Sequence, residues 1–204
     1  MIDTPLSLYI HFPWCARKCP YCDFNSHEVK SDIPETRYVE TLLRDLEFEL
    51  ESAPRKTLRS IFMGGGTPSL FSPEAISNLF AGIKDRFDIS EAEITLEANP
   101  GTFDQGHFDG YSEAGVNRLS IGAQSFSADA LTQLGRIHSP GEIELAYYGA
   151  RQAGFNRINI DLMHGLPGQT LGNALNDLKR AIELEPEHIS WYQLTIEPNT
   201  LFYK

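Results

Sequence analysis

The chain has 204 residues, of which 41% are hydrophobic and 22% charged, as is typical of a soluble globular domain and unlike a disordered chain. Its 28 acidic and 17 basic residues give a net charge of −11, which argues against nucleic-acid binding, because phosphate contacts need clustered Lys and Arg. Residues 1–5 lack the pattern of a signal peptide, and no later run approaches the roughly 18 apolar residues of a membrane span. The sequence therefore predicts a cytoplasmic protein without a transmembrane segment.

Apolar periodicity predicts strands that alternate with helices along the chain. The first strand covers 6–12 and is interrupted by Pro13, and an amphipathic helix follows over 34–51. Further strands are predicted at 58–63, 93–98, 117–122, 157–163 and 188–195, and further helices at 73–86, 104–114, 127–134, 140–153 and 171–184. This order predicts an α/β fold: a partial (β/α)6 TIM-like barrel of parallel strands with outer helices.

In such a barrel, ligand-binding groups lie at the carboxyl ends of the strands. Five predicted strands run into unusual residues at that end: the cysteines, the glycines of 64–66, Glu97, Gln124 and Asp161. The sixth strand has no covering helix after it, and an unpaired sheet edge is a liability for a free-standing domain. We therefore expect residues 1–204 to be one core domain of a protein that continues past Lys204.

All three cysteines, Cys15, Cys19 and Cys22, lie within eight residues of each other in the loop after the first strand. They are too close together, and odd in number, for the disulfide framework of a secreted domain. Three soft thiolates in one loop suit an iron–sulfur cluster and, less decisively, zinc. On a four-iron cluster they leave one iron open, whereas a zinc site would need His11 or His27 as a fourth ligand.

The C-x3-C-x2-C spacing after a first strand resembles the signature of the radical S-adenosylmethionine (SAM) superfamily. The segment YIHFPWC resembles its coproporphyrinogen-oxidase-like branch. The motifs GGGTP at 64–68, EANPG at 97–101, GAQSF at 122–126, LGRIH at 134–138 and DLMHGLP at 161–167 occur in that branch's order and spacing. The resemblance implies a radical SAM core domain over nearly the whole chain.

The resemblance also implies that Cys15, Cys19 and Cys22 hold a [4Fe-4S] cluster whose open iron binds SAM. The residues implied as SAM contacts are Tyr9, Tyr21, Gly65, Gly66, Thr67, Glu97, Gln124, Arg136 and Asp161. Each has a purely structural alternative: the glycines could form only a tight turn, the carboxylates could be helix caps or ion pairs, and Arg136 could pair with a surface acid. His164 is also expected on the ligand side, where a porphyrin or heme iron could meet it, although a lone histidine is more often structural.

Within this branch, oxygen-independent coproporphyrinogen III oxidases carry a fourth cysteine two residues after the third, and here Phe24 occupies that position. The segments CDFNSH at 22–27 and WYQLTIEPNT at 191–200 resemble instead the heme chaperones of the superfamily, which bind heme and pass it to acceptor proteins. A heme chaperone with heme or porphyrin as cargo is therefore the first hypothesis, and an oxidase that decarboxylates coproporphyrinogen III is the alternative. A tRNA-modifying radical SAM enzyme is disfavoured by the acidic charge.

Overall fold

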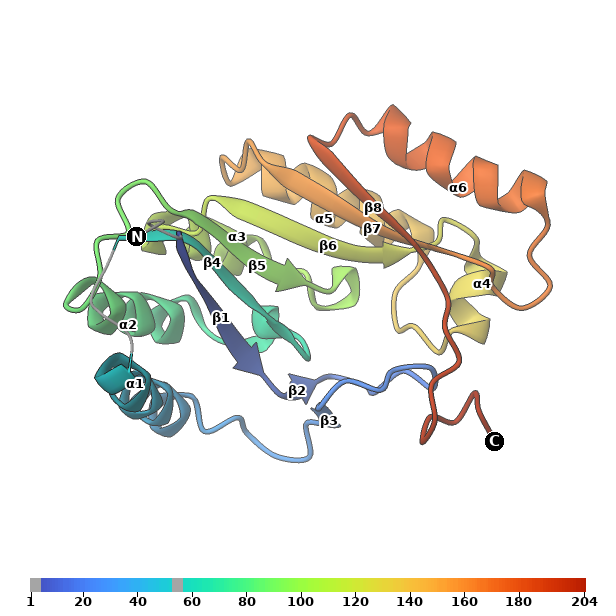
Figure 1. Cartoon of the computed structure of the whole chain (residues 1–204). Helices are drawn as coiled ribbons and strands as arrows, with labels where there is room; N and C mark the ends of the chain where they lie inside the picture. The colour runs from blue at the N-terminus through green and yellow to red at the C-terminus, as the bar shows by residue number, and fades with distance from the viewer. Residues whose placement is uncertain (1–4, 53–56) are drawn as a thin grey trace.

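The computed structural model describes residues 5–52 and 57–204, so the N-terminal residues 1–4 used in the signal-peptide argument lie outside the described residues. Six parallel strands form the main sheet in the order β1-β4-β5-β6-β7-β8 (Figure 1). The strands are β1 (Leu6–Phe12), β4 (Leu58–Gly65), β5 (Glu93–Ala98), β6 (Arg118–Gln124), β7 (Ile158–His164) and β8 (His188–Gln193). All six predicted strands are confirmed, with bounds that differ by no more than a few residues at either end.

Helices connect successive strands, as the alternation predicted. They are α1 (Glu35–Ser52), α2 (Pro73–Lys84), α3 (Gln105–Ala114), α4 (Ala128–Gln133), α5 (Pro140–Gln152) and α6 (Leu171–Glu183), with short 3-10 turns η1 (Pro68–Leu70) and η2 (Pro100–Thr102). Side-chain caps define several helix starts: Ser72 accepts a hydrogen bond from the Ala75 N–H at 3.2 Å, and Asp104 accepts one from the His107 N–H at 2.9 Å.

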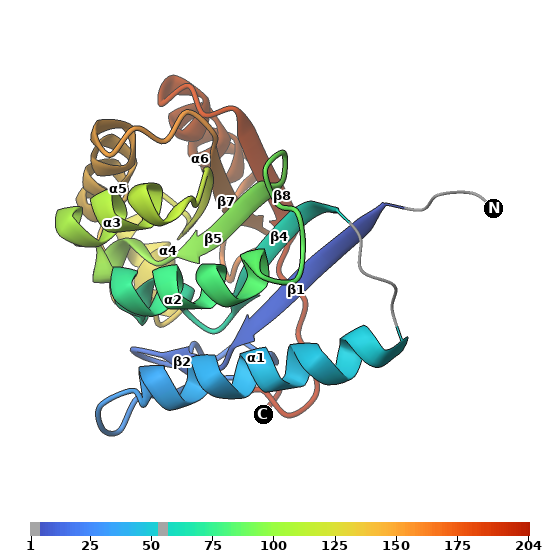
Figure 2. The same cartoon turned by 90° about the vertical axis from the view of Figure 1, so that its left-hand side faces the viewer.

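The sheet is curved, and the helices cover its convex side (Figures 1 and 2). Apolar side chains of the strands pack against those helices; Ile61, Leu96 and Ile160 are fully buried there. The two edges of the sheet are β1 and β8, so the barrel is open along one side within the part of the chain that is described. The predicted partial (β/α)6 barrel is confirmed.

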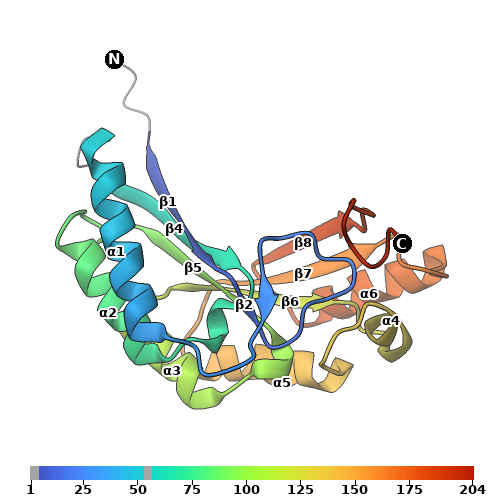
Figure 3. The same cartoon turned by 90° about the horizontal axis from the view of Figure 1, so that it is seen from below.

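A short pair of strands in the cysteine loop was not predicted. β2 (Trp14–Cys15) pairs in parallel with β3 (His27–Glu28), beyond the point where Pro13 ends β1. Seen from below, the loop between β2 and β3 crosses the open end of the sheet and reaches the C-terminal segment (Figure 3). The Phe202 N–H donates to the Pro20 carbonyl at 3.1 Å, which ties the two segments together.

Within residues 5–52 and 57–204, none of the helices combines the length and hydrophobicity that a transmembrane span requires.

Candidate functional site

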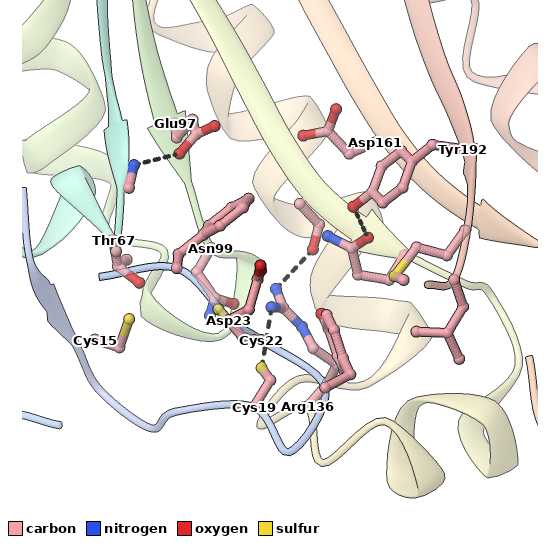
Figure 4. Close-up of a pocket in the computed structure, with 18 of the residues that line it drawn as sticks. Cys15, Cys19, Cys22, Asp23, Thr67, Glu97, Asn99, Arg136, Asp161 and Tyr192 are labelled. Carbon is pink, nitrogen blue, oxygen red and sulfur yellow. Dashed lines mark hydrogen bonds between the residues drawn. The ribbon is translucent and has the colours of Figure 1, made fainter. Parts of the chain in front are cut away.

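A cavity of about 300 Å³ lies at the carboxyl ends of the strands. Its walls come from the cysteine loop, the turn after β4, the ends of β5, β6, β7 and β8, and the loop before α5 (Figure 4). The structure brings the following predicted residues to this cavity: Cys15, Cys19, Cys22, Tyr21, Gly65, Gly66, Thr67, Glu97, Gln124, Arg136 and Asp161. Most of the predicted set therefore lies at the strand ends, where the ligands of barrel proteins bind.

Tyr9 is the predicted contact that does not line the cavity. It lies on β1, is 57% exposed, and its ring stacks on Phe62 with centroids 6.3 Å apart. Its hydroxyl bonds to Nδ1 of His11 at 3.0 Å. Tyr9 therefore belongs to an aromatic group on the sheet beside the cavity.

His164, which was expected on the ligand side, does not line the cavity either. Successive side chains of a strand point to opposite faces, and Asp161 and Met163 of the same strand line the cavity. His164 therefore points to the other face, where its ring packs edge-on against Trp191 with centroids 5.0 Å apart. The expectation for His164 was wrong because strand parity, rather than position along the chain, decides which side a residue faces.

Hydrogen bonds to its own backbone hold the cysteine loop, residues 13–28, in a compact conformation. The Cys22 N–H donates to the Cys19 carbonyl at 3.1 Å, which closes the turn between the second and third cysteines. The Lys18 ammonium donates to the carbonyls of Phe24 and Ser26 at 2.9 and 2.7 Å. A charged donor shared by two carbonyls holds the returning half of the loop in place, so all three thiols remain beside one cavity.

None of the three cysteines forms a disulfide, and the other two influence the thiol of Cys15 electrostatically. Burial raises the pKa of the Cys15 thiol, and the neighbouring Cys22 and Cys19 raise it further, while hydrogen bonds with Ser26 and Thr67 lower it. Metal ligation requires the thiolate, so binding of a cation here would release protons.

The zinc alternative requires a histidine beside the thiols, and neither candidate lies there. His11 contacts the Asn25 carbonyl through Nε2 at 2.8 Å, and its ring packs against Gly65 in the turn after β4. His27 is exposed, and its ring lies edge-on to that of Trp14. Within residues 5–52 and 57–204, no three His, Cys, Asp or Glu side chains converge on one point that could hold a metal ion. In a four-iron cluster each thiolate binds a different iron, so this donor set fits a cluster with an open iron better than a closed zinc site.

The glycine turn after β4 is shaped by its own packing. Gly65 has φ +109°, and a Cβ there would lie 2.4 Å from the His11 ring. A Cβ on Gly66 would lie 2.5 Å from the Trp14 carbonyl oxygen, and the Thr67 N–H donates to the same carbonyl at 2.7 Å. These contacts alone require glycine at both positions, whether or not a ligand is bound. The glycines form a tight turn that packs against the start of the cysteine loop.

Two carboxylates, Glu97 and Asp161, line the cavity from neighbouring regions of the sheet (Figure 4). Burial raises the pKa of Glu97 to about 7, the nearby Asp161 charge adds to the rise, and a hydrogen bond from the Gly65 N–H at 3.2 Å opposes it. Neither carboxylate takes part in an ion pair or a helix cap among the described interactions. That leaves oxygen atoms able to accept hydrogen bonds from a cationic or hydroxylated ligand.

Asp161 is oriented by a group of neutral donors inside the barrel. Ser120 donates to its Oδ2 at 2.9 Å and Asn159 to its Oδ1 at 2.7 Å. Ser190 in turn donates to Asn159 at 3.0 Å. Burial raises the pKa of Asp161, and these hydrogen bonds lower it. The donors come from β6, β7 and β8, so three strands fix the direction of one carboxylate.

Gln124 and Arg136 complete the wall opposite Glu97. Gln124 has a positive φ of +68° and lies at the point where the register between β6 and β7 is irregular. Its side-chain oxygen accepts a hydrogen bond from the Tyr192 hydroxyl at 2.7 Å. Arg136 donates to the Gly122 carbonyl at 2.8 Å, and its buried Nε has no hydrogen-bond partner. A buried donor without a partner is costly, so it points to a ligand acceptor.

Asn99 and Tyr192 also line the cavity and were not predicted as site residues. Asn99 follows β5, and Tyr192 lies near the end of β8, so the rule about strand ends could have found both.

The radical SAM superfamily model matches residues 9–181. The chain is 58% identical to the heme chaperone HemW of Haemophilus influenzae and 56% identical to that of Escherichia coli, in each case over 97% of this chain and 53% of the relative. It is also 37% identical to the mitochondrial radical S-adenosyl methionine domain-containing protein 1 of Danio rerio, over 97% of this chain and 45% of that protein. The chain thus spans about half the length of the curated relatives it matches.

Among solved structures, the coproporphyrinogen III oxidase HemN of Escherichia coli superposes with a TM-score of 0.86 at 31% identity, covering 98% of this chain and 46% of that one. SuiB of Streptococcus suis, solved with S-adenosylmethionine bound, shares the fold at 16% identity, with a TM-score of 0.67 over 97% of this chain and 42% of that one. The family match, the fold and the three cysteines at one cavity agree with the resemblance seen in the sequence. The chain belongs to the radical SAM superfamily.

Proposed function

We propose that this chain forms the radical SAM core domain of a heme chaperone of the HemW type, which binds a [4Fe-4S] cluster and SAM and transfers heme to an acceptor protein. The proposal rests mainly on one observation, the gathering of Cys15, Cys19 and Cys22 at a cavity with two partly buried carboxylates and an unpaired arginine donor. The similarity to HemW proteins supports the choice of heme as cargo. Cytoplasmic location and the absence of a nucleic-acid partner stay predictions from the sequence.

When bound and reduced, a [4Fe-4S] cluster supplies the electron that cleaves the sulfonium bond of SAM. The residues of the cavity would orient the ligand. Glu97 and Asp161 would accept hydrogen bonds from the SAM ammonium or ribose hydroxyls, and Nε of Arg136 would donate to its carboxylate. Because burial raises the pKa of Glu97 to about 7, this side chain changes between the neutral and the ionised form near neutral pH, and the ionised form makes the stronger hydrogen bond to an ammonium group.

Phe24 favours a chaperone over an oxidase. It occupies the position where the oxidases carry a fourth cysteine, lines the cavity, and is 59% exposed. An oxygen-independent coproporphyrinogen III oxidase remains the second candidate, because HemN has the same fold over nearly the whole of this chain.

Two measurements on the full-length protein separate these functions. The first is a spectral titration of the anaerobically reconstituted protein with heme, for which we expect saturable binding. The second is mass spectrometry after incubation with SAM, a reductant and coproporphyrinogen III. Loss of two carboxyl groups from the porphyrin would establish the oxidase, whereas heme binding without turnover would support the chaperone. Cys22→Ala should abolish the brown colour and the iron content, which tests the cluster itself.

A further inference from the structure

Arg136 contacts one of the three cysteines directly. Its Nη1 lies 3.6 Å from Sγ of Cys19, within hydrogen-bond distance for sulfur, while its Nη2 donates to the Gly122 carbonyl at 2.8 Å (Figure 4). The two contacts fix the plane of the guanidinium, because both terminal nitrogens are held at once. Of the three cysteine sulfurs, Cys19 is the one to which the described residues present a cationic donor. Sγ of Cys22 instead has a hydroxyl, that of Ser26, at 4.0 Å.

The contact is supported by packing of the two loops that carry it. Gly135, with φ +68°, lies against Pro20, and a Cβ at this glycine would be 2.6 Å from the proline ring. The Arg136 N–H donates to the Leu131 carbonyl at 2.9 Å, which fixes the backbone just after α4. Residues 135–136 and 19–20 therefore meet side by side, although the two sites are 117 residues apart in the sequence. The hydrogen bond to sulfur is part of this loop-to-loop contact and does not depend on a flexible surface side chain.

We propose that Arg136 is a positioning residue that raises the reduction potential of the cluster by donating a charge-assisted hydrogen bond to the Cys19 thiolate. The inference rests on the proposed cluster ligation by Cys15, Cys19 and Cys22. One-electron reduction adds a negative charge to the cluster, and part of that charge resides on the ligand sulfurs. A guanidinium keeps its positive charge at every relevant pH and stabilises the reduced state more than the oxidised state. Burial strengthens this interaction, because little water screens it.

The test is a redox titration of the reconstituted full-length protein with dithionite as the electron donor. The amount of reduced cluster at each potential is measured from its EPR signal. Arg136→Gln removes the charge, and Arg136→Lys keeps a charge but loses the rigid fork that reaches both Cys19 and Gly122. We expect Arg136→Gln to lower the equilibrium constant for reduction about tenfold, a shift of about 59 mV to more negative potential for one electron. Arg136→Lys should shift the potential in the same direction by a smaller amount.

The matched control is Arg17→Gln, because Arg17 is exposed, lines the same cavity, and has no bond to a cysteine sulfur among the described contacts. Its removal takes away the same charge without taking away a hydrogen bond to sulfur, so the potential should change little. An unchanged potential in Arg136→Gln, or an equal shift in Arg17→Gln, would overturn the inference.

Cluster content separates a failure of this inference from a failure of the proposed function. Wild-type protein without about four irons and four sulfides per chain after reconstitution would overturn both. A loaded wild type with an unshifted Arg136→Gln variant would overturn the role of Arg136 alone. Should Arg136→Gln fail to hold the cluster, Arg136→Lys decides: a more negative potential supports the hydrogen bond, and a wild-type potential refutes it.

Discussion

Replacing Glu97 by Gln should stabilise the protein at alkaline pH in the absence of SAM. Glu97 has a pKa of about 7, against an ordinary value of 4.5, because it is buried and lies near Asp161. A carboxyl group whose pKa is raised by folding makes the folded state less stable as it ionises. The penalty is absent below the ordinary pKa and is complete above the raised one, so stability falls as the pH rises from about 4.5 to above 7.

The size of the effect follows from the two pKa values. They differ by about 2.5, and at about 1.36 kcal/mol for each tenfold change this corresponds to up to about 3 kcal/mol. Gln has no charge to bury and keeps an oxygen that can accept from the Gly65 N–H. Relative to wild type, the free energy of unfolding of Glu97→Gln should be similar near pH 4.5 and higher by up to about 3 kcal/mol at pH 8.

Urea unfolding at pH values from 4.5 to 8.5, followed by circular dichroism, measures this difference directly. Glu91→Gln is the matched control, since Glu91 is exposed in the loop before β5. Its stability should run parallel to that of wild type across the range. The electrostatic reasoning fails if the difference between Glu97→Gln and wild type does not grow with pH, or if Glu97→Gln is the less stable protein at pH 8.

Three further changes test the supporting structure. Asn159→Ala removes the donor 2.7 Å from Asp161, so the dissociation constant of SAM, measured by calorimetry on cluster-loaded protein, should rise roughly three- to tenfold. Asp177→Ala should cost about 3 kcal/mol in urea unfolding, because this 2% exposed carboxylate accepts hydrogen bonds from a buried serine hydroxyl and a backbone N–H after β6. Gly65→Ala places a Cβ at a residue with positive φ and against the His11 ring. It should therefore lower the free energy of unfolding by about 2 kcal/mol or more and reduce cluster loading.

Each change has a control of the same chemistry at an unconstrained position. Asn156→Ala and Asp129→Ala alter exposed side chains and should leave SAM affinity and stability within about 0.5 kcal/mol of wild type. Gly141→Ala lies in the first turn of α5 with open space around the new Cβ, so it should be neutral or slightly stabilising. Equal effects in a variant and its control would show that the contact in question contributes nothing.

The alternation of strands and helices could be predicted from the sequence because it depends on local patterns. Apolar residues repeat with the period of a helix in α1 and in short continuous runs in the strands, and residues such as Ser72 and Asp104 define helix starts. Parallel strands with helical connections have few possible arrangements, so the partial barrel and its ligand face follow from this order. The cysteine spacing likewise carried the family resemblance.

The tertiary structure decided how those residues face one another. Strand parity directs His164 away from the cavity, and Tyr9 lies outside it with its ring stacked on Phe62. Burial and the nearness of Asp161 raise the pKa of Glu97, and no local pattern encodes either of them. The contact between Arg136 and Cys19 joins loops 117 residues apart in the sequence. Local sequence determines elements and motifs because their causes act over a few residues, whereas charge, exposure and contact within the site depend on distances that exist only after the chain has folded.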